Sequence, residues 1–106
     1  MSDSTPVYRE LHRQRAIEAA RGVADVLTGL GVTVLVTGSL ARGGFGPHSD
    51  IDFLVTACPR HLKYAIEGIV EDSLDGVRFD VVYLDEIPDW KVPHFTRGAV
   101  DVRHLR

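Results

Sequence analysis

Two kinds of hydrophobic spacing alternate along this chain, and their order limits the folds open to it. Residues 6–30 and 60–74 repeat apolar side chains at intervals of three and four, as amphipathic helices do. Segments 32–36, 51–55 and 77–84 are short and rich in β-branched residues, as strands are. This alternation indicates an α/β fold of the α+β type, in which helices pack on a small mixed β-sheet.

Each predicted element has a predicted buried side. The first helix should bury Ile17, Ala20, Val23, Ala24, Leu27 and Leu30. The second should bury Leu62, Ala65, Ile66, Ile69, Val70 and Leu74. Strand 32–36 has no polar alternation, so we expect it to be buried on both faces. Residues 39–43 can form a short helix, and beyond residue 84 the weak pattern allows a short helix and a strand over 100–105.

Length and composition narrow the function classes. The 106 residues predict one domain, 1–106, in which residues 1–5 are expected to form a mobile tail. A formal net charge of −3 argues against an extensive nucleic-acid-binding surface. The single cysteine, Cys58, excludes an internal disulfide and a thiolate zinc site. No apolar run approaches the ~20 residues that span a bilayer, and no signal peptide is evident, so we expect a cytoplasmic protein.

Two carboxylates begin the second predicted strand. Because alternate residues of a strand share a face, Asp50 and Asp52 should project together while Ile51 and Phe53 face the core. Adjacent carboxylates repel each other, and a hard cation such as Mg²⁺, which takes oxygen ligands and substrate phosphates, relieves that repulsion. The alternative interpretation is a pair of solvated carboxylates in a turn, since Asp-x-Asp alone is common.

The loop before these carboxylates suits a phosphate group. Gly38-Ser39 follows a buried strand directly, so its backbone N–H groups and the serine hydroxyl are available as donors. Arg42 can add a charge-assisted contact to phosphate. The alternatives are a plain strand-to-helix turn and an exposed surface arginine. No Gly-Lys-Ser/Thr sequence is present, which excludes a P-loop.

A third carboxylate lies in the third predicted strand. Asp80 stands among Phe79, Val81 and Val82, where a charge is costly unless it is paired or bound to metal. If this strand neighbours 51–55, Asp80 can reach the face that carries Asp50 and Asp52. Its alternative role is that of a salt-bridged strand residue.

Together these residues carry a family resemblance. Gly38-Ser39-Leu40-Ala41-Arg42-Gly43, then five residues, then Ser49-Asp50-Ile51-Asp52-Phe53-Leu54-Val55, resembles the signature of the minimal nucleotidyltransferases of the DNA polymerase beta superfamily. Phe79-Asp80-Val81-Val82 extends the match. The resemblance implies a polymerase-beta-like core in which Asp50, Asp52 and Asp80 hold two Mg²⁺ ions. It also implies that Asp80 activates the acceptor hydroxyl and that Gly38 and Ser39 hold the triphosphate, with Arg42 beside them.

The resemblance further implies a reaction and a partner. It predicts transfer of a nucleoside monophosphate, with AMP from ATP as the default, to an acceptor hydroxyl. Similarity to antitoxins of HEPN toxin–antitoxin pairs suggests that a HEPN-type protein supplies the acceptor, a tyrosine side chain. A binding antitoxin with an idle metal site, and a transferase acting on a small molecule such as an aminoglycoside, stay open. So does an oligomer with itself or with a partner.

Overall fold

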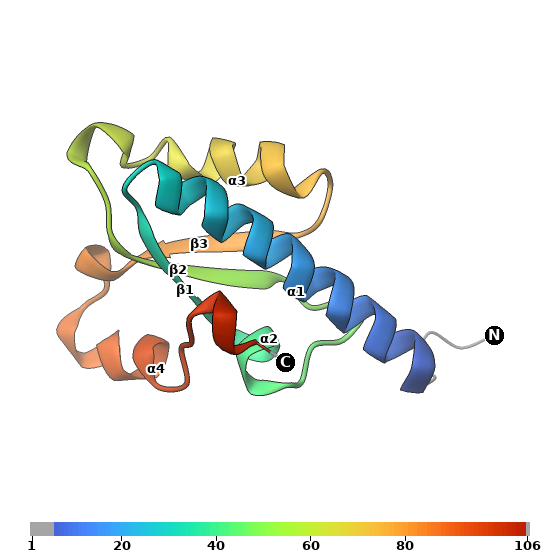
Figure 1. Ribbon diagram of the computed structural model, residues 1–106. Coiled ribbons are helices and arrows are strands. Elements are labelled where there is room, and N and C mark those ends of the chain that lie inside the picture. Colours follow the sequence, from blue (N-terminus) through green and yellow to red (C-terminus); the bar gives the residue numbers. More distant parts are fainter. Residues whose placement is uncertain (1–5, 106) are drawn as a thin grey trace.

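A three-stranded mixed sheet organises the molecule, which we describe from a computed structural model over residues 6–105 (Figure 1). Strands β1 (Thr33–Thr37) and β2 (Ile51–Ala57) are antiparallel, while β3 (Phe79–Tyr83) runs parallel to β2. The spatial order is β1-β2-β3. The predicted class, helices on a small mixed sheet, is confirmed. The expected tail at residues 1–5 lies outside the described residues.

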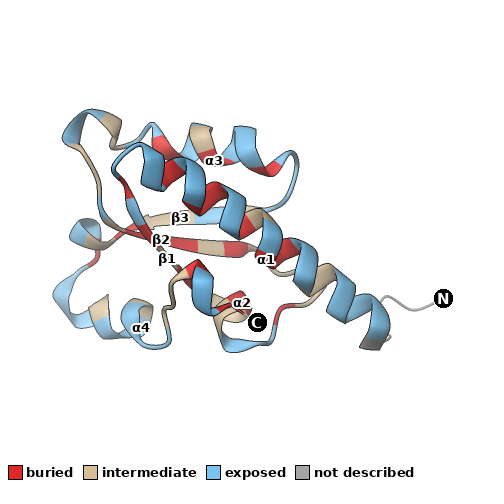
Figure 2. Ribbon diagram, in the orientation of Figure 1, coloured by how far each residue is buried: buried red, intermediate tan, exposed pale blue. Residues whose placement is uncertain are grey.

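Two helices cover one face of this sheet. Helix α1 (Pro6–Gly29) and helix α3 (Ile66–Leu74) lie side by side there (Figure 1), and both carry buried residues along their length (Figure 2). The predicted stripe of α1 is buried, except that Leu30 lies beyond the helix and is 43% exposed. The core residues of these helices are Ala16, Ile17, Ala20, Val23, Ala24, Leu27, Ile66, Val70 and Leu74.

The predicted helix over 60–74 is interrupted. A single 3-10 turn, Arg60–Leu62, comes first, and α3 begins only at Ile66. Tyr64 between them has a φ of +69°, a left-handed conformation that no α-helix contains. Ala65, expected in the core, is therefore exposed. No glycine or proline marks this break, so hydrophobic spacing could not indicate it.

The C-terminal segment folds back on α1 and β1. After the 3-10 turns Leu84–Glu86 and Asp89–Lys91, helix α4 (Val92–Thr96) leads to a last 3-10 turn, Val102–His104. The predicted strand over 100–105 is wrong, because only Val100 bridges to Val36 of β1. The guanidinium of Arg21 instead donates to the carbonyls of Val102 and Leu105 at 3.3 and 3.1 Å.

This folding back buries apolar residues of the segment. Val102 and Leu105 are 8% and 4% exposed, whereas Trp90 is 77% exposed.

Strand β1 is less enclosed than expected, since Thr33 is exposed and Leu35 only half-buried. Across residues 6–105, no helix has both the length and the apolar character needed to cross a membrane.

Candidate nucleotidyl-transfer site

The sheet register brings two of the predicted carboxylates together. Asp52 of β2 is the direct partner of Asp80 on β3, and residues paired in parallel strands share a face. Thr37, the last residue of β1, is paired with Asp52 from the other side. Asp80 is exposed rather than enclosed by Phe79, Val81 and Val82, because β3 lies at one end of the sheet order. The cost of burial expected for its charge is therefore absent.

Gly38 comes extremely close to the Asp52 carboxylate. It begins helix α2 (Gly38–Arg42) immediately after β1, with a φ of +72°. A Cβ atom at this position would lie 2.1 Å from Asp52 Oδ2, well inside van der Waals contact. Only glycine permits both the backbone angle and this approach. Gly38 and Asp52, which the sequence predicted separately, therefore lie directly against each other.

Neighbouring charges act on the carboxylate of Asp52. Partial burial raises the pKa of Asp52 above its ordinary value, and the neighbouring carboxylates of Asp80 and Asp50 raise it further. The Arg42 guanidinium acts in the opposite direction. Two further carboxylates and one arginine thus act on the charge of Asp52. A cation would relieve the repulsion among the carboxylates.

Asp50 has a partner that the sequence did not indicate. The Nε of Arg78 lies 2.9 Å from Asp50 Oδ1. That oxygen is shielded from solvent, yet it accepts no hydrogen bond from any described residue, so the Arg78 N–H is not aligned with it. Arg78 stands two residues before Asp80, and this even spacing along the strand direction is the signal that could have suggested it.

The fit to a divalent metal can be judged from these contacts. Within residues 6–105, no three His, Cys, Asp or Glu side chains are grouped tightly enough to hold a metal ion as they stand. The oxygen atoms present nevertheless suit a divalent metal ion. Asp50 contributes a buried oxygen without a hydrogen bond, and Asp52 adjoins Asp80 in the sheet register. The assignment of Asp50, Asp52 and Asp80 as metal ligands stays a prediction.

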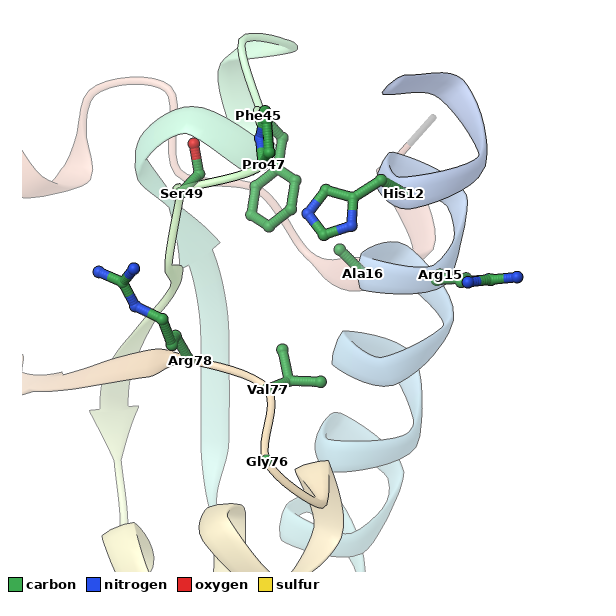
Figure 3. Close-up of a pocket in the computed structure, with 9 residues that line it drawn as sticks. All are labelled: His12, Arg15, Ala16, Phe45, Pro47, Ser49, Gly76, Val77 and Arg78. Carbon is green, nitrogen blue, oxygen red and sulfur yellow. The ribbon is translucent and has the colours of Figure 1, made fainter. Parts of the chain in front are cut away.

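The loop between α2 and β2 borders a cavity of about 340 Å³ (Figure 3). Gly43, with a φ of +88°, ends α2, and the Ser49 hydroxyl accepts a hydrogen bond from Gly46 N–H at 3.0 Å. The Phe45 ring is buried and stacks on His12 of α1 at 5.3 Å. Figure 3 shows these rings facing each other from the loop and the helix. The loop is thus anchored to α1 beside the carboxylates.

Comparison with known proteins identifies the family. The family model described as a nucleotidyltransferase domain matches residues 19–101, which include all the predicted site residues. The chain belongs to the nucleotidyltransferase domain family. It also resembles a solved structure whose protein is assigned as a minimal nucleotidyltransferase. That similarity has a TM-score of 0.62 and 27% identity, over 86% of this chain and 92% of that chain. Curated proteins give no match.

Membership in the nucleotidyltransferase domain family indicates the general reaction of this chain. Nucleotidyltransferase domains transfer a nucleoside monophosphate from a nucleoside triphosphate and generally use a divalent metal ion. Such a reaction needs donors for a polyphosphate and carboxylates for a hard cation. The resemblance drawn from the sequence signature is therefore confirmed at the level of family and fold.

Proposed function

We propose that this nucleotidyltransferase domain is a Mg²⁺-dependent enzyme that transfers AMP from ATP to a hydroxyl group on a partner protein. The observation that carries the proposal is the pairing of Asp52 with Asp80, with the Gly38 backbone against Asp52. This arrangement sets the expected triphosphate-binding turn beside the expected metal-binding carboxylates. Transfer of AMP then needs only an acceptor hydroxyl near Asp80.

Each residue has a role in this proposal. Gly38 and Ser39 hold the triphosphate through backbone N–H groups and the serine hydroxyl, and Arg42 balances its charge. Asp50, Asp52 and Asp80 would hold two Mg²⁺ ions, and these would supply positive charge to the oxygens of the transferred phosphate. The hydroxyl oxygen bonds to the α-phosphorus as the bond to pyrophosphate breaks, and Asp80 accepts the hydroxyl proton.

The exposed position of Asp80 supports a macromolecular acceptor. Because β3 lies at one end of the three-stranded sheet, a side chain of another molecule can approach Asp80 from that side. The C-terminal segment folds back on α1 and β1, so it is not arranged as an acceptor-binding domain. We propose a HEPN-type protein as the partner and a tyrosine as the acceptor, in a cytoplasmic toxin–antitoxin pair.

The test is transfer of labelled nucleotide. The purified chain is mixed with [α-³²P]ATP, Mg²⁺ and candidate acceptors, and the products are separated and analysed by mass spectrometry. We expect a mass increase of one AMP on a partner tyrosine that depends on Mg²⁺. Labelling of an aminoglycoside instead would assign a small-molecule transferase. Partner inhibition without any label would assign a binding antitoxin.

A further inference from the structure

Arg78 lies at the site but has none of the roles proposed above. It immediately precedes β3, and its carbonyl accepts a hydrogen bond from Ile51 N–H at 3.0 Å. This backbone contact fixes Arg78 next to the start of β2, beside Asp50. Figure 3 shows its guanidinium directed away from the stacked rings of His12 and Phe45.

The contact between Arg78 and Asp50 is an ion pair without an aligned hydrogen bond. Arg78 Nε is 2.9 Å from Asp50 Oδ1, but that shielded oxygen accepts no hydrogen bond from the described residues. The Arg78 side chain is 67% exposed. Aligned, charge-assisted hydrogen bonds are the strong arginine contacts, whereas exposed ion pairs contribute little. The contact can therefore be displaced by a better ligand.

The charges nearby explain why Asp50 has a counter-ion. Asp50, Asp52 and Asp80 repel one another, and Arg42 offsets that repulsion at Asp52. Asp80 is exposed to water, which solvates its charge. Asp50, with one oxygen shielded from solvent, has the Arg78 guanidinium instead. Without a metal ion, the carboxylate charges are thus offset in three ways: by Arg42 at Asp52, by water at Asp80 and by Arg78 at Asp50.

We propose that Arg78 is the resident counter-ion of Asp50 and that a divalent cation must displace its guanidinium to bind there. The inference rests on the proposed function, because it takes Asp50 as a metal ligand. The guanidinium and the cation compete for one oxygen atom and also repel each other. Arg78 therefore weakens metal binding by the nucleotide-free protein, and the site fills mainly when a nucleotide adds negative charge.

The experiment measures Mn²⁺ binding without nucleotide, by the loss of the free-ion signal in electron paramagnetic resonance. Arg78→Gln is compared with wild type at low ionic strength. We expect binding about threefold to tenfold tighter in the variant, from the loss of one ion pair and one repelling charge. The difference should shrink in 1 M salt, where the Debye length falls to about 3 Å.

Four further variants isolate the cause. In an Asp50→Asn background, Arg78→Gln should change the affinity by less than about twofold, because the shared carboxylate is gone. Arg78→Lys keeps the charge and should fall between wild type and Arg78→Gln. Arg103→Gln is the matched control, since Arg103 makes a similarly exposed pair with Asp101 at 3.0 Å and should have no effect.

Two failures are distinguishable. Equal or weaker Mn²⁺ binding by Arg78→Gln, with binding by wild type intact, overturns the counter-ion role and leaves the proposed function standing. An absence of Mn²⁺ binding in every variant without nucleotide, together with an absence of Mg²⁺-dependent label transfer, overturns both the counter-ion role and the metal-dependent function. A thermal melt of each variant verifies that it is folded before binding is measured.

Discussion

The two faces of strand β2 differ in what they contribute, although their residues alternate along one backbone. Ile51, Phe53 and Val55 belong to the core with α1 and α3 and are at most 4% exposed. Asp52 points the other way, against Gly38 and beside Asp80. One face removes apolar surface from water, which stabilises the fold. The other face gathers like charges around Asp52, and their repulsion opposes folding.

This difference teaches that residue parity separates the core from the charged surface at the start of β2, whereas further along the strand Leu54, on the face of Asp52, is also buried. A shift of one residue in the strand register would move Asp52 into the core and Phe53 into the site. Substitutions at neighbouring positions should therefore have unrelated consequences. Those at Ile51, Phe53 and Val55 should change the free energy of unfolding, and those at Asp52 should change transfer.

The largest expected effect is on catalysis, at Asp52. Asp52→Asn should reduce nucleotide transfer by about a thousandfold or more, because it removes a proposed charged ligand from the proposed metal-dependent reaction. The fold should persist, since asparagine has nearly the same size and one repelling charge is lost. Initial rates of label transfer and a urea melt measure the two properties. Asp89→Asn, on an exposed turn, is the control and should leave both unchanged.

The next effect is on stability, at the adjacent residue. Phe53 is 1% exposed, and Phe53→Ala should lower the free energy of unfolding by about 3–5 kcal/mol through lost burial and a cavity. Urea denaturation measures this change. Val77→Ala, at a residue that is 40% exposed, should cost less than about 0.5 kcal/mol. A Phe53→Ala protein with near wild-type stability would contradict the division between the two faces.

A smaller effect sharpens the comparison, because one residue on the site face is structural. Thr37 is paired with Asp52, is 8% exposed, and donates through Oγ1 to the Phe95 carbonyl at 3.1 Å. Thr37→Val keeps the shape but removes this link to α4, so it should cost about 0.5–1.5 kcal/mol. Chemical denaturation gives the value. Unchanged stability would mean that water replaces the bond fully.

The smallest effect concerns pH. The pKa of Asp52 is raised in the folded protein, so the folded state binds this proton more tightly than the unfolded chain. Without metal, stability should therefore fall as pH rises from the ordinary pKa of 3.8 toward the raised value, and then level off. Asp52→Asn should lack this component. Thermal melts in EDTA at several pH values compare the two proteins, and parallel curves would refute the assignment.

Hydrophobic spacing predicted the parts of the fold that depend on local pattern. The burial of Ile17, Ala20, Val23, Ala24 and Leu27 on α1 and the order of the three strands along the chain follow from periodicity and residue type. The break at Tyr64 did not, because its left-handed conformation depends on tertiary contacts, including the bond from its N–H to the Tyr83 hydroxyl at 3.1 Å. The prediction for the C-terminal segment was also wrong. Its position depends on hydrogen bonds from Arg21 to carbonyls that lie 81 and 84 residues later in the sequence.

The candidate site divides in the same way. Strand parity and a fixed motif singled out Asp50, Asp52 and Gly38 as candidates, and the structure places Gly38 directly against Asp52. The partner of Asp50 was missed despite the even spacing of Arg78 and Asp80, since Arg78 reaches Asp50 only through the pairing of β3 with β2. Local sequence patterns therefore identify candidate site residues, whereas the register of β2 and β3 determines which charged side chains form ion pairs.

Gly38 has a consequence for natural variation. Any other residue there would need an unfavourable φ of +72° and would drive a carbon atom into Asp52 Oδ2. Asp80, by contrast, is exposed and can be replaced without disturbing the backbone. In a library of random variants selected only for folding, codon 80 should therefore diversify while codon 38 stays fixed. Among homologues that have lost activity, Asp80 should disappear first and Gly38 should outlast it.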